Sequence, residues 1–568
     1  MAQYERIADA PEAIARLRRL ILDLAVRGKL VPQDATDEPV RELLTRIAKE
    51  KSRLAKAREI RKPKAIPALP ETPFPIPSNW CWSQLAEIGV LSPRNEAPDT
   101  LEASFVPMPL IAAEYGVANQ HEVRPWGEIK KGYTHFAEGD VGLAKITPCF
   151  ENGKSAVFRN LTGGIGSGTT ELHIVRPLFV DQDFILIFLK SPHFVQTGIP
   201  KMTGTAGQKR VPTEYFAHSP FPLPPLAEQQ RIVAKVNELM CLCDRLEAAQ
   251  EGREIVRDRL TAASLECLSA PDADSFQANA RFALDALPSL AKRPDQIKAW
   301  RQAILNLAVR GRLVPQDVND EPASALLERL HGERTHKRKF AQIVEDDLEE
   351  PLPELPSGWL WTTPDQISAD DESAITDGPF GSQLKTDHYI QASGFRVIRL
   401  QNVGAGSFRE EHHSFIEKSR YERLSKHHIH AGDLVVAGLV DPSVRCCEVP
   451  ANIGPALVKA DCYRFAVHPK LSSRYALHCL NSQLTQRFAA AHHHGMTLTR
   501  IGLGNFRRIP VPLPPLAEQH RIVARVDELM VLCDRLEASL ATSTTTRRRL
   551  LDALLAEAVD PSPLAEAA

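Results

Sequence analysis

The chain has 568 residues, of which 43% are hydrophobic and 25% charged, and its formal net charge is −2. This length exceeds what one hydrophobic core usually serves, so at least three structural bodies are expected, and the composition argues against disordered and fibrous classes. Apolar runs such as FILIFL are far too short to span a bilayer, and charges are scattered through the N-terminal stretch, so the sequence predicts a cytoplasmic protein. The near-neutral total neither indicates nor excludes binding to nucleic acid, because a basic surface can be offset elsewhere.

An internal repeat divides the chain into two halves and fixes its organisation. The repeated segments are LAVRGKLVPQD (24–34) and LAVRGRLVPQD (307–317), PSNWCW (77–82) and PSGWLW (356–361), and the 26 residues 222–247 and 512–537, which differ at four positions. Each half is predicted to contain, in order, a basic helical hairpin, a Pro-rich linker, a Trp-x-Trp segment, a divergent insert of about 140 to 150 residues and the repeated Leu-Pro-Pro-Leu helix.

Each arm of the repeat carries a basic run. Residues 41–64 hold ten Lys and Arg against three acids, and RTHKRK at 334–339 occupies the matching place in the second half. A solvated linker helix and a contact with a nucleic-acid backbone are both consistent with such a run.

The two inserts share one local signal and differ elsewhere. HFAEGDVGLAK at 135–145 and HIHAGDLVVAG at 428–438 each predict a strand, a tight turn and a second strand. The scaffolds of the inserts are therefore expected to be related, although the remaining sequences have little in common. A duplicated frame with unlike inserts suggests one type of partner bound twice by the frame and two different ligands read by the inserts.

The repeated Leu-Pro-Pro-Leu segment is predicted to open a long helix. Pro224 and Pro225 suit the first turn, where a missing N–H costs nothing, and Glu228 lies near the positive end of the helix dipole. An apolar heptad stripe follows in both copies, at Ile232, Val236, Leu239, Cys243 and Leu246 and at Ile522, Val526, Leu529, Cys533 and Leu536. The pattern continues to about Leu268 and Leu555, which predicts helices of about 40 residues and about 60 Å.

A helix of that length cannot bury its stripe alone. Because the two copies have nearly identical faces, we expect them to pack against each other as a two-helix spacer between the inserts. The alternative is that each stripe covers its own insert.

With these motifs in place, the chain resembles the DNA specificity subunits of type I restriction-modification systems from about residue 16 to residue 558. The segments that carry the resemblance are LPPLAEQQRIVAKVNELM, LPPLAEQHRIVARVDELM, ILDLAVRGKLVPQD, GDVGLAKITPCFENGKSA and DGPFGSQLK. The resemblance implies a mixed α/β (α+β) fold with two globular target recognition domains, joined by two long antiparallel coiled-coil helices in a pseudo-twofold repeat. The N-terminal arm of about 75 residues departs from the family's usual arrangement.

The resemblance also implies function and partners. Each target recognition domain would read one half of an asymmetric, bipartite double-stranded DNA target, and the paired helices would fix the gap between the halves. DNA methyltransferase subunits, expected as two, would dock on the repeated frame, and restriction (translocase) subunits would complete the assembly. The chain itself would be non-catalytic and bind no cofactor, with S-adenosylmethionine and ATP on the partner subunits.

The domain boundaries follow from the repeat and the resemblance. The expected segments are an N-terminal helical arm with basic linker at 1–75, target recognition domain 1 at 76–221, a central spacer helix region at 222–294, a second arm and linker at 295–355, target recognition domain 2 at 356–511 and a distal spacer helix region at 512–568.

Charge has to be considered locally to find DNA contacts. Residues 83–221 hold 12 Lys and Arg against 14 acids, and residues 362–511 hold 17 against 14, so neither insert is basic as a whole. Two acid-free strips, 184–213 and 462–517, are candidate phosphate-facing surfaces. Their cations include Lys190, Lys201, Lys209 and Arg210 in the first strip and Lys470, Arg474, Arg487, Arg500, Arg507 and Arg508 in the second. Solvated surface loops are the alternative for each residue.

Among these cations, Arg210 and Arg500 occupy equivalent positions of the two copies, and we assign phosphate contacts to them and to Lys201 and Lys209. Base reading is assigned to Lys154 in ENGKS and to Ser382, Gln383 and Lys385 in GSQLK. The reason is chemical, since Lys can donate to guanine's major-groove acceptors and Gln can pair with adenine.

Catalytic and metal-binding patterns are weak. GGIGSGTT at 163–170 has Thr169 where a phosphate loop needs Lys, and DPSV at 441–444 lacks the aromatic residue of an amino-methyltransferase motif. The histidines of HHIH (427–430) and HHH (492–494) have no acid or Cys at ligand spacing, and the ten cysteines lack CxxC pairs, so reduced thiols and no metal are expected. Two functions stay open: a DNA-reading subunit, and a coiled-coil scaffold whose inserts bind proteins.

Overall fold

The computed structural model describes residues 10, 12–62, 65–69, 72–205, 207–269, 282, 286–335, 338–344, 351–391, 394–439, 443–494 and 499–559. The chain has a mixed α/β fold and forms two compact units, residues 1–254 with 543–568 and residues 255–542. These are fewer than the three bodies expected from length, because in each half the arm, the insert and the repeated long helix share one large hydrophobic cluster. Of the helices in the described residues, none is both long and apolar enough to cross a bilayer.

The predicted helical hairpins are confirmed in both arms. They are α2 (Ala13–Val26) and α3 (Val40–Lys56) in unit 1, and α11 (Pro294–Val309) and α12 (Ala323–Gly332) in unit 2.

Glycines explain why the arm motif and the Pro-Ser-x-Trp motif repeat together. Gly28 has a φ of +68° at the end of α2, and a Cβ placed on it would lie 2.4 Å from Cγ of Pro77. Gly311 has a φ of +66°, and its Cβ would lie 2.4 Å from Cγ of Pro356. Only glycine combines this backbone conformation with so close a neighbour.

The first insert consists of two four-stranded sheets. Their strand orders are β2-β9-β6-β7 and β4-β3-β8-β5, and β3 and β8 are parallel whereas the other paired strands are antiparallel. The strands are β2 (Gly89–Leu91), β3 (Glu102–Val106), β4 (Glu122–Pro125), β5 (Thr134–Ala137), β6 (Val141–Ala144), β7 (Ser155–Val157), β8 (Ile165–Gly168) and β9 (Leu172–Pro177). The helices are α4 (Leu85–Ile88), α5 (Trp126–Ile129), α6 (Gln182–Lys190), α7 (Pro192–Gly198) and α8 (Thr213–His218).

The second insert repeats this topology. Its sheets have the orders β12-β19-β16-β17 and β14-β13-β18-β15, again with one parallel pair, β13 and β18. The strands are β12 (Ile375–Asp377), β13 (Phe395–Ile398), β14 (Phe415–Ile416), β15 (His428–Ile429), β16 (Leu434–Ala437), β17 (Arg445–Glu448), β18 (Ala456–Val458) and β19 (Cys462–Phe465). The helices are α13 (Pro364–Ile367), α14 (Lys418–Arg423), α15 (Ser473–Leu480), α16 (Gln483–Ala491) and α17 (Leu503–Phe506). The predicted kinship of the two scaffolds is therefore confirmed.

The predicted strand-turn-strand motifs are also confirmed, and a buried acid holds each turn. Asp140, in the turn between β5 and β6, accepts a hydrogen bond from the backbone N–H of Ala137 (2.7 Å) and one from Nε of Arg176 (2.8 Å). Asp433 accepts the same pair of bonds, from the N–H of His430 (2.9 Å) and Nε of Arg464 (2.7 Å).

Each insert is closed where the chain enters and leaves it. Strand β1 (Cys81–Ser83) pairs antiparallel with β10 (Phe221–Leu223), and β11 (Leu360–Thr362) pairs in the same register with β22 (Val511–Leu513). The Trp-x-Trp segment and the start of the Leu-Pro-Pro-Leu segment thus lie side by side in both units.

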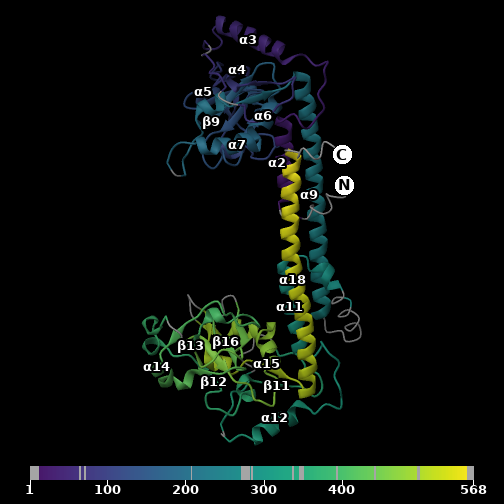
Figure 1. Cartoon of the computed structure of the whole chain (residues 1–568), viewed down its shortest axis with the longest axis vertical. Helices are drawn as coiled ribbons and strands as arrows, with labels where there is room; N and C mark the ends of the chain where they lie inside the picture. Colours follow the sequence, from purple (N-terminus) through teal and green to yellow (C-terminus); the bar gives the residue numbers. More distant parts are fainter. Residues whose placement is uncertain are drawn as a thin grey trace. The chain divides into compact units, whose positions relative to one another are not determined.

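The two long helices are α9 (Leu226–Ser269) and α18 (Leu516–Val559), each of 44 residues, slightly longer than predicted. Figure 1 shows both as continuous helices. Unit 1 contains the first part of α9 and the last part of α18, whereas unit 2 contains the last part of α9 and the first part of α18. This order is that of an antiparallel pair, as predicted.

The heptad stripe has a different partner from the one expected. In unit 1, Ile232, Val236 and Cys243 are buried in a core that also contains residues of α2 and α6. In unit 2 the equivalent residues of α18 are buried with α11 and α15. The prediction that these stripes pack on each other was wrong, because each one covers the arm helix and insert of its own half.

Polar residues of the repeated helix attach it to the same two neighbours. Arg231 forms an ion pair of 2.6 Å with Asp37 of the arm, and the side chain of Gln229 accepts a 2.8 Å hydrogen bond from the N–H of Asp181, which caps α6. In unit 2, Arg521 pairs with Asp320 at 2.7 Å, and Gln519 accepts from the N–H of Ser472 at 3.1 Å. The repeated sequence therefore encodes a repeated joint between arm, insert and long helix.

Candidate nucleic-acid interface

Arg210 and Arg500 occupy equivalent places in the structure as well as in the sequence. Arg210 donates from Nε and Nη2 to Glu171, both at 2.9 Å, and Arg500 lies 2.9 Å from Asp461. The two acids are also 290 residues apart, and each directly precedes an inner strand of its sheet, β9 or β19. The guanidinium of Arg210 lowers the pKa of Glu171 by hydrogen bonding.

Both arginines are held in ion pairs yet stay open to solvent. The exposed fraction of the side chain is 43% for Arg210 and 33% for Arg500. A surface ion pair contributes little to stability, so exchanging the carboxylate for a phosphate oxygen costs little free energy. Their assignment as phosphate contacts stays a prediction, to which the structure adds a competing intramolecular acid.

Lys201 and Lys209 lie close to Arg210 along one exposed segment. Lys201 ends a short 3-10 helix, Ile199–Lys201, and Thr203 pairs antiparallel with Arg210. Both lysine side chains are exposed, and no hydrogen bond or ion pair of either ammonium occurs within the described part of the chain. The segment therefore brings three of the predicted phosphate contacts together.

Other cations of the two acid-free strips bind acids or backbone carbonyls of the chain itself. Lys190 is only 8% exposed and its ammonium contacts backbone carbonyls, so its assignment to a phosphate-facing surface was wrong. Arg474 pairs with Asp527 at 2.8 Å, and Nη2 of Arg507 donates to the carbonyl of Ile375 at 2.9 Å.

Lys154, assigned to base reading, is half-buried beside β7. Its Nζ donates to the carbonyl of Met108 at 3.3 Å, a long and weak hydrogen bond. The ammonium is thus oriented by the neighbouring loop and keeps two of its three donors for a ligand.

Ser382, Gln383 and Lys385 form one exposed group in the second insert. Leu384 between them is fully buried, which turns its neighbours outward. The carbonyl of Gln383 accepts a 2.9 Å hydrogen bond from Nη1 of Arg420, and the carbonyl of Leu384 accepts one from Nζ of Lys459. Two cations therefore fix the backbone of this segment and leave its side chains exposed.

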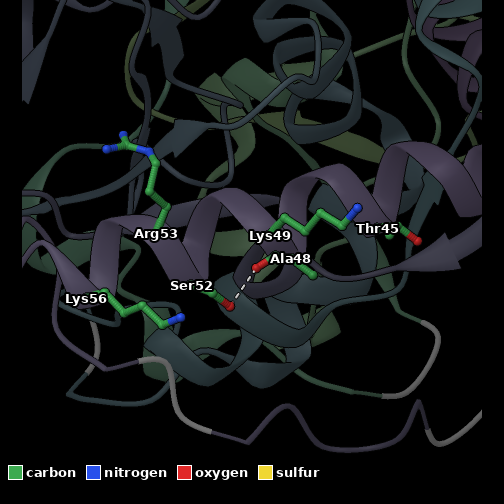
Figure 2. Close-up of a pocket in the computed structure, with 6 residues that line it drawn as sticks. All are labelled: Thr45, Ala48, Lys49, Ser52, Arg53 and Lys56. Atoms are coloured by element: carbon green, nitrogen blue, oxygen red, sulfur yellow. Dashed lines mark hydrogen bonds between the residues drawn. The ribbon is translucent and has the colours of Figure 1, made fainter.

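The basic run of the first arm forms an exposed helix face. Figure 2 shows Lys49, Arg53 and Lys56 projecting from α3, together with the short side chains of Thr45, Ala48 and Ser52. Arg53 is paired with Glu50 at 2.8 Å. Lys51 instead points inward to the carbonyl of Ala86, and burial lowers its pKa to about 8.

The basic run of the second arm is used differently. Helix α12 has 10 residues where α3 has 17, and the chain then turns so that Nη2 of Arg334 donates to the carbonyl of Ser368 at 2.6 Å. Arg338 donates to the hydroxyl of the same serine at 2.8 Å. These two arginines are therefore structural, which neither interpretation of the basic run, a solvated helix or a nucleic-acid contact, had predicted. His336 and Lys337 of this run, and Pro63 and Lys64 of the first run, lie outside the described residues.

The histidine and cysteine patterns gather no metal ligands in the described part of the chain, where no group of three or more His, Cys, Asp or Glu could hold an ion. His428 is engaged with the carbonyl of Tyr421 at 2.8 Å. Nine cysteines are free thiols. The side chains of Cys267, His493 and His494, together with Asp441 and Pro442, lie outside the described residues.

A buried carboxylate at the start of each long helix was missed as a structural centre. Glu228 is fully buried and accepts hydrogen bonds of 3.0 Å from Trp80 and Gln33, and Glu518 accepts from Trp359 (2.9 Å) and Gln316 (3.1 Å). The signal was present in the sequence, since the three motifs that supply these residues are the three that repeat. Burial raises the pKa of Glu518.

The family model and the curated proteins that match this chain all describe type I restriction specificity subunits. The family model for the type I restriction modification DNA specificity domain matches residues 432–542. The type I restriction enzyme EcoEI specificity subunit of Escherichia coli is 38% identical over 560 residues, covering 95% of this chain and 93% of its own. The EcoAI specificity subunit of the same organism is 35% identical over 570 residues, covering 96% and 94%.

Two solved structures were also matched. A chain from work on complex assembly and conformational transition of the type I R-M system has a TM-score of 0.48 at 18% identity, covering 86% of this chain and all of its own. The HsdS subunit from Thermoanaerobacter tengcongensis has a TM-score of 0.45 at 19% identity, covering 86% and 99%.

Proposed function

Since the chain belongs to the family of type I restriction enzyme specificity subunits, we propose that its two inserts read the two halves of one asymmetric, bipartite DNA target. Membership of this family makes the chain the non-catalytic subunit that recognises DNA.

The observation that carries the proposal is the contrast between one topology and two surfaces. Both inserts have the same strand order and the same ion pair, Arg210 with Glu171 and Arg500 with Asp461. Yet the residues assigned to base reading differ, with Lys154 in the first insert and Ser382, Gln383 and Lys385 in the second. Equivalent cations are suited to phosphates, which are alike in every sequence, and unlike side chains are suited to different bases.

The repeated joint supports the partner arrangement. The long-helix residues 222–247 and 512–537 differ at four positions and make the same contacts with arm and insert in each unit. Two equivalent surfaces favour one kind of partner bound twice, which we assign to two methyltransferase subunits that carry S-adenosylmethionine. The restriction subunits would add ATP-dependent chemistry. The rival function, a scaffold with protein-binding inserts, has no support among the relatives.

The test is methylation mapping in cells that contain the chain with its methyltransferase subunits. The expected result is modified adenine at one asymmetric motif of two separated parts. Replacing residues 83–221 by the matching segment of a relative should change one part only. A palindromic motif, or a change in both parts, would contradict modular reading.

The gap between the parts offers a second measurement. Deleting four residues, about one helical turn, from a long helix should change the tolerated gap and leave the bases unchanged. Altered bases at an unchanged gap would show that the helices do not set the spacing.

A further inference from the structure

Lys190 is a buried cation that joins two loops of the first insert. It is the last residue of α6, and its Nζ donates to the carbonyls of Ala113 (2.7 Å), Gly153 (3.0 Å) and Ala112 (3.3 Å). An ammonium has three N–H donors, so all of them are used. Among the described residues no carboxylate lies within ion-pair distance of Lys190.

The two loops are those that surround Lys154. Gly153 directly precedes Lys154, and Ala112 and Ala113 follow the 3-10 helix that begins at Met108. Lys154 itself donates to the carbonyl of Met108 at 3.3 Å. The same pair of loops is thus joined twice, once by a buried ammonium and once by the half-buried one assigned to base reading.

The second insert shows what the position requires structurally. Ser191 and Ser482 close equivalent helices by donating to the carbonyls of Phe188 and Cys479, both at 2.7 Å, which aligns Lys190 with Asn481. The side-chain amide of Asn481 donates to the carbonyl of Cys446 at 2.9 Å. A neutral amide is therefore sufficient to hold the neighbouring strand segment.

What lysine adds at this position is the contact with Ala112 and Ala113. That addition has a cost, because an ammonium removed from water without a paired carboxylate is unfavourable. Burial lowers the pKa of Lys190 to about 7, and Glu114 opposes that shift. A costly group where the sister insert has an amide points to a role beyond folding.

We propose that Lys190 is a positioning residue for base reading in the first half-site. It fixes the segment from Met108 to Ala113 against the loop that carries Lys154, and so determines where the Lys154 ammonium lies. This inference rests on the proposed function, because it assumes that the first insert reads bases.

The decisive variant is Lys190→Asn, which copies the second insert. Its matched control is Lys131→Asn, the same change at an exposed lysine of the same insert. Binding is measured on a duplex with the mapped target and on duplexes with single changes in each half. Lys190→Asn should lower discrimination by about fivefold or more at a base pair of the first half, and Lys131→Asn should not. Discrimination in the second half should stay unchanged in both variants.

Hydrogen exchange separates positioning from unfolding. In Lys190→Asn, amides of residues 108–115 and 149–154 should exchange faster while those of β6 and β9 keep their protection. If Lys190→Asn does not fold, Lys190→Arg keeps the charge and the donors but moves the loops, and it should change discrimination at the same base pair. Unaltered first-half discrimination in a folded variant overturns the inference.

Failure of the proposed function would look different. If the unmodified chain recognises no bipartite target, there is no first half-site and the proposed function itself is wrong. If it recognises one and the Lys190 variants read it normally, only the role of Lys190 is wrong.

Discussion

The indole Nε1 of Trp80 donates a 3.0 Å hydrogen bond to the fully buried carboxylate of Glu228. Trp80 comes from the segment before the first insert, and Glu228 from the first turn of α9. Gln33 of the arm donates to the same carboxylate at 3.0 Å. One acid therefore joins three segments that are distant along the chain, and Glu518 does the same in unit 2.

Replacing Glu228 by Gln should destabilise unit 1. Trp80 and Gln33 donate to one carboxylate oxygen, Oε1, whereas Asn79 donates to the other, Oε2, at 3.0 Å. The NH2 group of Gln cannot accept the bond from Asn79, so we expect a loss of about 1–3 kcal/mol in the free energy of unfolding. Hydrogen exchange measures this loss: amides of α2 and α6 should exchange faster, and the exchange rates in α15 should not change. Glu518→Gln is the matched control and should affect α11 and α15 instead. Equal changes in both units would contradict two separate joints.

His478 should make unit 2 sensitive to acid. It is nearly buried, and burial lowers its pKa from 6.5 to about 4, although Asp527, 3.7 Å from its Nε2, opposes the shift and Arg474 adds to it. Between pH 6.5 and 4 the unfolded chain binds a proton that the folded chain does not, so stability falls as pH falls through this window.

The expected loss is about 3 kcal/mol between pH 7 and 4, relative to a variant without the group. His478→Leu is that variant, and chemical denaturation at several pH values gives the difference. A constant difference across the window would show that His478 keeps an ordinary pKa in the folded state.

The ion pair of Arg210 and Glu171 allows a direct test of DNA contact. Arg210→Gln should weaken binding to all sequences alike and reduce the salt dependence of log K by about 1. Glu171→Gln removes the competing acid, so it should preserve or strengthen binding. If both variants weaken binding equally, Arg210 acts only through its ion pair. Arg500 and Asp461 give the same comparison in the second insert.

The exposed face of α3 should contact DNA phosphates next to the first half-site. Arg41, Lys49 and Lys56 are exposed, lie on one face of α3, and are about 10 to 12 Å apart along the helix. Changing all three to Gln should reduce the slope of log K against log salt by about 2 to 3 and leave the bases recognised unchanged.

A net-charge effect has to be separated from a contact. Lys235, Arg329 and Arg525 are three cations in ion pairs elsewhere in the chain, and their triple Gln variant removes the same charge. An equal change of slope in both triple variants would identify α3 as a solvated helix.

The sequence predicted much of this fold because the repeat displays it twice. The long helices, the arm hairpins, the Gly-Asp turns and the equivalence of Arg210 and Arg500 all follow from patterns in the two halves. The partner of the heptad stripe could not be predicted, since the same spacing of Ile232 and Val236 serves any apolar surface, whether a second long helix or the arm and insert of the same half.

The candidate site was harder to predict than the fold. An acid-free stretch does not show which cations face solvent, because backbone carbonyls can hold an ammonium without any acid nearby, as they do for Lys190. The two basic runs look alike in sequence, yet Arg334 is 9% exposed and Arg53 is exposed. Whether a cation is buried against backbone carbonyls or exposed to solvent depends on its position in the folded structure.

The strand pairs β1 with β10 and β11 with β22 have a consequence for how new specificities arise. The chain enters and leaves each insert through adjacent strands, and the two inserts have the same register there. Recombination between genes at these points would therefore transfer a complete insert and preserve the contacts between arm, insert and long helix. The matching registers also make the two positions interchangeable in principle. Exchange of one insert, or reversal of the order of the two inserts within one gene, would then produce a protein that recognises a different DNA sequence.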